Sequence, residues 1–268
     1  MGLLDGREER PAPDGYRMAL GDDGVAVLAF DRPDKRNALT AGMWEALPGL
    51  LQDTGRLPGV RVLLLTGVGP HFSAGADIDD LNEAYSEPAR ARSYHGMNVA
   101  AETALAGCPL PTVAVVHGAC VGGGCQLAVA CDLRIAADDA RFGITPAKLG
   151  VVYPAEPTTR LARLVGPARA KYLLYTADLV EAPRAYEFGL VDELVPDADL
   201  DSRALVLART IAGRSPQSIG AAKAVIEAAA GGRDTAMALA GWQHRADDVR
   251  EGIEAFRAGR PPRFTDPH

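Results

Sequence analysis

Residues 112–127, which read TVAVVHGACVGGGCQL, decide the fold of this chain. The run Thr112 to Val116 is β-branched and apolar, which is typical of a strand buried on both faces. It leads through Gly118 into three consecutive glycines, 122–124, and then into the apolar, helix-like segment Cys125 to Ala130. The stretch therefore predicts a buried strand, a glycine-rich loop and a helix in direct succession.

The same order occurs upstream and downstream. Val60 to Thr66 is another apolar run of strand length, which ends at Gly67 and opens into a glycine-rich loop. Helices are expected between 78 and 106, and Leu133 to Ala136 reads as a further strand. Strands that alternate with helices favour an α/β fold with mainly parallel pairing.

The N-terminal part adds a hairpin and a helix. Tyr16 to Leu20 and Val25 to Phe30 have strand patterns and flank the turn sequence GDDG, residues 21–24. Thr40 is a good N-cap residue, so a helix is expected from there to just before Gly55.

The C-terminal part differs in composition. From Thr158 onward the chain is rich in Ala, Leu and Arg and reads mainly as helix, interrupted by prolines and by one short run, 190–195. At 268 residues the chain is long enough for one large domain with a helical appendage. We expect a core over residues 1–200 and a C-terminal helical region over residues 201–268.

Composition excludes several classes of function. The formal net charge of −7 argues against binding to nucleic acids or to anionic membranes. There is no apolar run of about 18 residues, and the first ten residues lack the apolar part of a signal peptide, so a cytoplasmic location is expected. The four cysteines, 108, 120, 125 and 131, form no CxxC pair and read as buried thiols, so no metal site is expected.

Two junctions between a strand and a loop are candidates for chemistry. The strand ending at Thr66 opens into residues 71–78, HFSAGADI, and the strand ending at Val116 opens into residues 118–125. Small residues allow a ligand to approach backbone N–H groups, and two converging N–H groups make an oxyanion hole. Glycines after a strand are otherwise turn formers, and neither loop fits a nucleotide-binding motif.

Several motifs, in order and at similar spacing, resemble those of the crotonase superfamily, the enoyl-CoA hydratases and isomerases. They cover most of the chain: RPDKRNAL (32–39), FSAGADI (72–78), HGACVGGGCQL (117–127), CDLR (131–134), FG (142–143), LG (149–150), FGLVD (188–192) and EGIEAF (251–256). The resemblance implies a spiral of ββα units with a C-terminal helical trimerisation region, assembled as a homotrimer or a dimer of trimers.

The resemblance also implies a site. Ala76 and Gly123 would supply the two N–H groups of the oxyanion hole. Coenzyme A, as part of the substrate and not as a separate cofactor, would lie along the first and second of these motifs and the triple glycine. The implied contact residues are Lys35, Arg36, Ala38, Leu39, Ala74, Ala76, Asp77, Ile78, Gly122, Gly123 and Pro146. Phe256 with Arg257 or Arg260 are candidates to reach a neighbouring subunit's site.

The chain departs from the family at the two positions where hydratases carry catalytic glutamates. Gln126 stands at the first and Pro146 at the second. An amide can hold a water molecule but does not take its proton at neutral pH, and proline has no side-chain acid or base. We therefore expect chemistry that needs an enolate but no strong base, such as decarboxylation.

Residues 145–153 are also similar to the methylmalonyl-CoA decarboxylase branch of the family. That branch likewise has proline at the second position and a tyrosine where this chain has Tyr153, but it carries histidine in place of Ala76 and glutamate in place of Gln126. Tyr153 is a candidate proton donor, with packing as the alternative. Glu156 is a candidate acid or base, with helix capping as the alternative.

Two other functions remain open on the sequence. One is a hydratase or isomerase that has moved its acid/base group to Glu156 or His95. The other is a non-catalytic acyl-CoA-binding protein, because loss of both glutamates is also what a retired enzyme would show. In each case the thioester is carried either by coenzyme A or by an acyl carrier protein.

Overall fold

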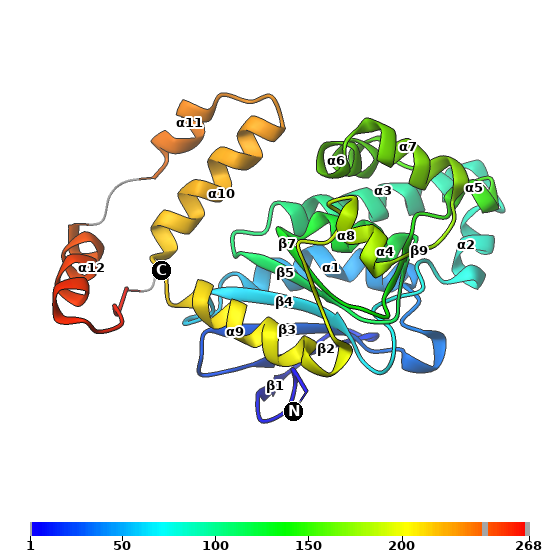
Figure 1. Ribbon diagram of the computed structural model, residues 1–268. Coiled ribbons are helices and arrows are strands. Elements are labelled where there is room, and N and C mark those ends of the chain that lie inside the picture. The colour runs from blue at the N-terminus through cyan, green and yellow to red at the C-terminus, as the bar shows by residue number, and fades with distance from the viewer. Residues whose placement is uncertain (1, 243–245, 266–268) are drawn as a thin grey trace.

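A seven-stranded sheet forms the centre of the protein (Figure 1), which we describe from a computed structural model of residues 2–242 and 246–265. All pairs from β3 to β10 are parallel, whereas the β1–β2–β3 edge is antiparallel. In spatial order the strands are β1 (Glu8–Arg10), β2 (Tyr16–Leu20), β3 (Val25–Phe30), β4 (Val62–Gly67), β5 (Thr112–Val116), β7 (Leu133–Ala137) and β10 (Glu193–Val195). The predicted α/β fold with mainly parallel pairing is confirmed.

The predicted hairpin and first helix are present. Strands β2 and β3 pair in antiparallel register, and the Gly24 N–H donates to the Gly21 carbonyl in the connecting turn. Helix α1 (Ala41–Thr54) begins where the Thr40 hydroxyl accepts a hydrogen bond from the Met43 N–H at 3.2 Å, and it ends before Gly55. The N-cap therefore acts as the sequence predicts.

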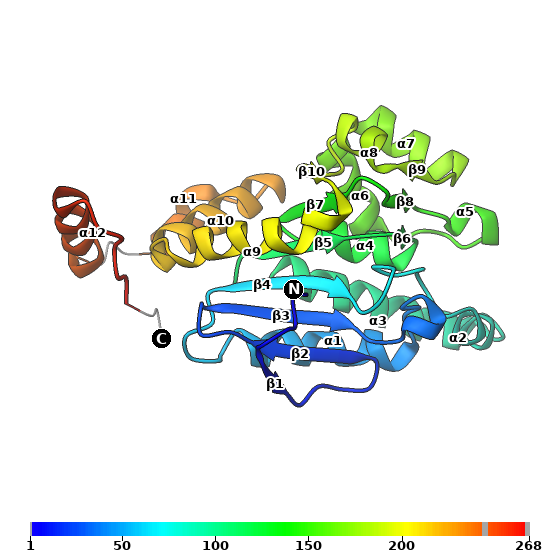
Figure 2. The ribbon, with the colours of Figure 1, turned by 60° about the horizontal axis from the view of Figure 1, so that its bottom comes forward.

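Both faces of the sheet are covered, because alternate residues of each strand point to opposite sides. Val27 and Leu64 face helix α9 (Leu200–Ala212), which lies across one face of the sheet (Figures 1 and 2). Leu28 and Leu65 face the opposite side. The helices of that side are α1, α3 (Pro88–Ala106), α4 (Gly123–Ala130) and α6 (Ala155–Val165).

A second sheet has three strands. Each strand has only two or three residues, which is too short to be predicted from the sequence. Its strands are β6 (Ala119–Val121), β8 (Arg141–Gly143) and β9 (Val180–Glu181). It pairs β6 with β8 in parallel and β8 with β9 in antiparallel. Strand β6 lies directly between strand β5 and the triple glycine, so this sheet holds the glycine-rich loop in place.

The remaining elements of the described chain are helices, most of them short. They are η1 (Pro33–Lys35), α2 (Ile78–Ala84), α5 (Pro146–Leu149), α7 (Pro167–Thr176), α8 (Ala182–Glu187), η2 (Asp197–Asp199), α10 (Pro216–Ala230), α11 (Thr235–Ala240) and α12 (Ala246–Ala258). Pro167, Pro183 and Pro216 lie in the first turns of α7, α8 and α10. There the missing N–H has no intrahelical partner to lose, so these prolines mark helix starts.

Two motifs that carried the family resemblance meet beside the sheet. The buried Arg134 of β7 donates from Nη2 to Asp192 Oδ2 at 2.8 Å, and its own backbone N–H donates to the same oxygen. The Asp192 N–H in turn donates to the Arg134 carbonyl. This pair joins the CDLR and FGLVD stretches and sets where β10 joins the sheet.

Helices α10, α11 and α12 extend away from the sheet, whereas α9 packs on it (Figure 2). Helix α10 is tied to the body by Lys223, whose Nζ donates to Asp132 Oδ2 at 2.7 Å and to the Leu110 carbonyl at 2.9 Å. Asp132 also accepts from the Thr112 N–H, so it joins strand β5 to helix α10. The domain boundary after residue 200 stays a prediction. Within residues 2–242 and 246–265, no helix is long and apolar enough to span a bilayer.

Candidate active site

The loop after β4 lies alongside the loop after β5. The Phe72 N–H donates to the His117 carbonyl, the Ser73 N–H to the Ala119 carbonyl, and the Val121 N–H to the Ser73 carbonyl, each at 2.9 Å. The two glycine-rich junctions are therefore joined by a short parallel ladder. This confirms that the two loops converge.

On its other edge, the loop after β4 pairs with the segment before α1. The Leu39 N–H donates to the Gly75 carbonyl at 2.7 Å, and the Asp77 N–H donates to the Leu39 carbonyl at 2.8 Å. Successive peptide groups of an extended chain point in opposite directions, so the N–H of Ala76 points away from Leu39. Among the residues that the structure describes, it donates no hydrogen bond.

Two glycines permit the close approach of this loop to helix α4. Gly75 has a φ of +97°, and a Cβ at this position would lie 2.8 Å from the Val121 carbonyl oxygen and 3.3 Å from the Gly123 nitrogen. A Cβ at Gly123 would lie 2.6 Å from Cζ2 of the buried Trp44. Only glycine fits either position without displacement of neighbouring atoms.

Gly123 is the first residue of α4, and the first N–H groups of a helix have no intrahelical acceptor. The N–H groups of Ala76 and Gly123 are thus free of partners in the described chain and lie on the wall of one cavity. The positive end of the α4 dipole also faces this cavity. The arrangement suits an oxygen atom that gains negative charge.

The cavity has a volume of about 130 Å³. Its wall contains eight of the predicted site residues, namely Ala74, Ala76, Ile78, Gly122, Gly123, Gln126, Pro146 and Tyr153. The other predicted residues, Lys35, Arg36, Ala38, Leu39, Asp77 and Glu156, do not line it. The structure thus brings the oxyanion residues, both substituted glutamate positions and Tyr153 together.

The predicted coenzyme A loop lies next to the cavity. Lys35 and Arg36 are exposed, and neither forms an ion pair within the described parts of the chain. The Ala38 carbonyl accepts from Arg32, and Leu39 is buried in the core, so these two residues act through their backbone. Ile78 is 62% exposed and lies at the start of α2, beside the cavity.

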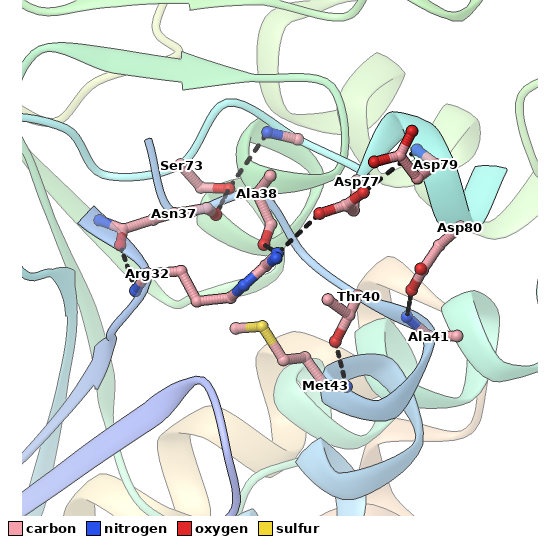
Figure 3. A network of polar contacts seen from close by, with 11 residues as sticks. Arg32, Asn37, Ala38, Thr40, Ala41, Met43, Ser73, Asp77, Asp79 and Asp80 are labelled. Atoms are coloured by element: carbon pink, nitrogen blue, oxygen red, sulfur yellow. Dashed lines mark hydrogen bonds and ion pairs between the residues drawn. The ribbon is translucent and has the colours of Figure 1, made fainter. Parts of the chain in front are cut away.

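A polar network fixes this loop against the oxyanion segment (Figure 3). Arg32 Nη1 donates to Asp77 Oδ2 at 2.8 Å and to the Ala38 carbonyl at 2.6 Å. The buried Asn37 amide donates to the His71 carbonyl at 2.6 Å. The Arg32 bond, aided by the Asp79 N–H, lowers the pKa of Asp77. Asp77, which the resemblance places among the coenzyme A contacts, serves here as the N-cap of α2 and the anchor of the loop.

The two substituted positions face the cavity without an acid or base. Gln126 is 2% exposed, and its Nε2 donates to Asn98 Oδ1 at 2.6 Å. Pro146 is the first residue of the short helix α5. No Asp or Glu of the described residues lines the cavity. His95, exposed on α3, is the histidine among the described residues that line the cavity.

Burial keeps two phenols of the cavity wall, those of Tyr94 and Tyr153, protonated. Burial raises the pKa of Tyr153 well above its usual value of 10, and it raises the pKa of Tyr94 to about 12. Tyr153 is half-buried and its hydroxyl has no partner in the described chain. It can therefore donate a hydrogen bond or a proton to a bound group. Glu156, by contrast, is exposed in the first turn of α6, where Pro154 and not Glu156 is the N-cap.

Sequence reasoning missed Asn98 and Glu102. Tyr94, Asn98 and Glu102 are spaced four residues apart on α3, so they share one face of the helix. That face points toward α4 and α6: Asn98 bonds Gln126 of α4, and the fully buried Glu102 accepts from Arg160 Nε of α6 at 2.5 Å. The spacing of four indicates that the three residues share a face, but not that this face is the one toward the cavity.

Two backbone N–H groups without partners in the described chain, one of them at the start of α4, converge on a cavity beside an exposed basic loop, and this arrangement suits the carbonyl oxygen of a thioester. The family model "Enoyl-CoA hydratase/isomerase" matches residues 21–267. The chain therefore belongs to the enoyl-CoA hydratase/isomerase family, within the crotonase superfamily, which confirms the predicted family and its fold.

Individual relatives agree with this assignment. The chain is 38% identical to a Thermus thermophilus protein that is provisionally named an enoyl-CoA hydratase, over 90% of this chain and 97% of the relative. It is 34% identical to the crotonyl-CoA hydratase of Syntrophomonas wolfei, over 91% and 95% of the two chains. A solved enoyl-CoA hydratase/carnithine racemase from Magnetospirillum magneticum superposes with a TM-score of 0.90 at 29% identity, over 96% and 97% of the chains.

The lowered pKa of Asp77 predicts a pH-dependent contribution to stability. The ionised carboxylate stabilises the folded state fully above the ordinary aspartate pKa of 3.8, and this contribution is lost as the pH falls through the lowered folded-state pKa. We expect Asp77→Asn to reduce the free energy of unfolding by about 1.5 kcal/mol at neutral pH, measured by urea denaturation.

The difference between the wild type and Asp77→Asn should narrow when both are measured at about pH 3. Asp79→Asn is the matched control, because the Asp79 side chain is exposed and accepts no hydrogen bond in the described chain. An Asp77→Asn effect that is equally large at both pH values would show that the ion pair is not its cause.

Proposed function

We propose that this protein acts on a short acyl-CoA thioester through an enolate held by the N–H groups of Ala76 and Gly123, and that its reaction is a decarboxylation. One observation carries the proposal: the cavity keeps both oxyanion donors, yet Gln126 and Pro146 occupy the positions of the two catalytic glutamates. A reaction that makes the enolate without a base fits this combination.

Decarboxylation of a malonyl-type thioester needs only these groups. The bond between the carboxylate carbon and the α-carbon breaks, and its electron pair moves into the thioester to form the enolate while carbon dioxide leaves. The two N–H groups stabilise the enolate oxygen, and each such donor is typically worth about a hundred- to a thousandfold in rate. A proton from Tyr153 or from water then adds to the α-carbon, and solvent reprotonates the phenol.

The neutral wall of the cavity favours this reaction. A substrate carboxylate inside it would meet amide and phenol groups and, at the exposed edge, His95, but no Lys or Arg of the described residues. Neutral hydrogen-bond donors can hold a carboxylate there but do not balance its charge as a cation would, whereas the charge of the enolate is met by the two oxyanion donors. This difference between the bound carboxylate and the enolate lowers the free-energy barrier to loss of carbon dioxide.

The size of the cavity supports a short acyl group. Sites for drug-sized ligands usually have volumes of about 300–1,000 Å³, whereas this cavity has about 130 Å³. It suits the acyl end of the thioester, with the remainder of the carrier outside. The exposed Lys35 and Arg36 would then meet phosphates of coenzyme A, which favours coenzyme A over an acyl carrier protein.

A second candidate is hydration or isomerisation of an enoyl-CoA. It is supported by the names of relatives, among them the Syntrophomonas wolfei hydratase and a peroxisomal dienoyl-CoA isomerase of Arabidopsis thaliana that is 32% identical. The proton would have to be carried by His95, because Glu156 lies outside the cavity wall.

We further propose that the protein is a cytoplasmic homotrimer or dimer of trimers that associates through its C-terminal helices. Val249, Ile253 and Phe256 lie on one side of α12 and are exposed, Phe256 to 87%. Arg260 is engaged with Glu251, which leaves Phe256 and Arg257 to reach a neighbouring site.

We expect sedimentation equilibrium to give a mass at least three times that of one chain. Ile253→Asp should lower this mass, because it places a charge on the exposed apolar side of α12. A monomeric wild type would contradict the proposal.

The central test is incubation with methylmalonyl-CoA, malonyl-CoA and crotonyl-CoA separately, with products followed by mass spectrometry. We expect decarboxylated product from at least one of the first two. Gly123→Ala should reduce the rate about a hundredfold or more, because its Cβ collides with Trp44 and displaces an oxyanion donor. Tyr153→Phe should reduce it by about tenfold or more if the phenol supplies the proton.

Two controls accompany these variants. Glu156→Gln should leave decarboxylation unchanged, because this carboxylate is exposed and lies off the cavity wall. Gly49→Ala, at an open position in α1, should also be neutral. Hydration of crotonyl-CoA alone would favour the second candidate, and binding of all three thioesters without turnover would indicate a non-catalytic acyl-CoA-binding protein.

A further inference from the structure

A pair of amide side chains stands in the cavity where the family's acid/base chemistry would otherwise occur. Gln126 on α4 and Asn98 on α3 both line the cavity and are joined by the 2.6 Å hydrogen bond from Gln126 Nε2 to Asn98 Oδ1. The bond fixes the two side chains relative to one another. Asn98 belongs to none of the motifs by which the family was identified.

Each amide keeps one polar group free. No hydrogen bond in the described chain engages Gln126 Oε1 or Asn98 Nδ2. These two atoms are also not enclosed by protein, since the enclosed side-chain atoms without a partner are Trp44 Nε1, Tyr94 Oη, Glu102 Oε2 and Arg134 Nε. Because Gln126 is 2% exposed overall, its carbonyl oxygen is reached from the cavity and not from the outer surface.

The resulting pattern is one hydrogen-bond acceptor next to one donor. Turning both amides by 180° exchanges the roles of the two residues but leaves one acceptor and one donor facing the cavity. Tyr153, on the same wall, adds a hydroxyl that stays protonated. The wall therefore offers neutral hydrogen-bonding groups at several points.

A hydrocarbon acyl group would displace water from these groups and leave them without partners, which is costly. We propose that Asn98 is a specificity-determining residue, and that the Asn98–Gln126 pair selects acyl groups that carry a hydroxyl or carboxyl substituent over hydrocarbon acyl groups. This inference rests on the proposed function for the place of the thioester in the cavity, and it defines the substrate class.

The test measures binding, so that it does not depend on turnover. Isothermal titration calorimetry of the full-length protein would compare butyryl-CoA, 3-hydroxybutyryl-CoA and succinyl-CoA, whose carboxylate is not lost by decarboxylation. We expect the wild type to bind at least one of the oxygenated thioesters about tenfold more tightly than butyryl-CoA. Asn98→Leu should reduce that preference to less than about twofold.

Asn98→Asp separates substrate contact from a structural role. The new carboxylate repels succinyl-CoA but still accepts a hydrogen bond from a hydroxyl, so binding of succinyl-CoA should weaken more than binding of 3-hydroxybutyryl-CoA. Asn82→Leu makes the leucine change at an exposed asparagine of α2 that does not line the cavity, and it should leave all three affinities unchanged.

Equal binding of all three thioesters by the wild type would overturn the inference, as would a preference that survives in Asn98→Leu. If Asn98→Leu does not fold, the wild-type comparison and Asn98→Asp still decide the question. Failure to decarboxylate any thioester, with the binding preference intact, would refute the proposed reaction alone. Turnover of a malonyl-type thioester without the preference would refute only the role of Asn98.

Discussion

The close approach of Gly75 to the first turn of helix α4 is the constraint on which the site depends. The two segments come from different strands, β4 and β5, and they are held together by the backbone ladder between residues 72–73 and 117–121. Parallel strands that lie side by side bring the loops at their carboxyl ends together, so the main sheet already determines that these loops are neighbours. Gly75 and Gly123, which have no side chains, then allow the loop after β4 to come into close contact with the start of α4.

Around this contact, the groups that hold the loops in place differ from the groups that line the cavity. Charged groups serve to hold the loops: Arg32 with Asp77 anchors the segment before α1, and Arg134 with Asp192 anchors the end of the sheet. The polar groups of the cavity wall are backbone N–H groups, amides and hydroxyls, together with the imidazole of the exposed His95. Such a wall can stabilise an oxyanion while offering no strong base, which is the physical reason for preferring a reaction that generates its own enolate.

Much of the fold and of the site could be predicted from the sequence, because the patterns that indicate them lie within short stretches of the chain. The run Thr112 to Val116 is the strand that the sequence predicts, the Thr40 cap begins α1, and Ala76 and Gly123 share one cavity. The small second sheet was missed, because strands of two or three residues carry no period. Asn98 was missed because its role depends on a hydrogen bond with Gln126, which lies 28 residues away on another helix.

Sequence position was also misleading for Glu156. It follows the site motifs closely along the chain, but the first turn of α6 places it at the surface. Conversely, the buried carboxylate of Glu102 lies within an otherwise unremarkable helical segment, and burial raises its pKa although Arg160 opposes the shift. Which side of a helix faces a cavity depends on the packing of neighbouring helices, and that information is not contained in a motif.

The most direct measurement of the central claim is the infrared stretching frequency of an isotopically labelled thioester carbonyl in butyryl-CoA bound to the protein. Hydrogen bonds from Ala76 and Gly123 would polarise the carbonyl, so we predict a clear shift to lower frequency in the wild type and a much smaller shift in Gly123→Ala. A bound carbonyl whose frequency equals that in water, or a shift unaffected by Gly123→Ala, would contradict the oxyanion-hole account.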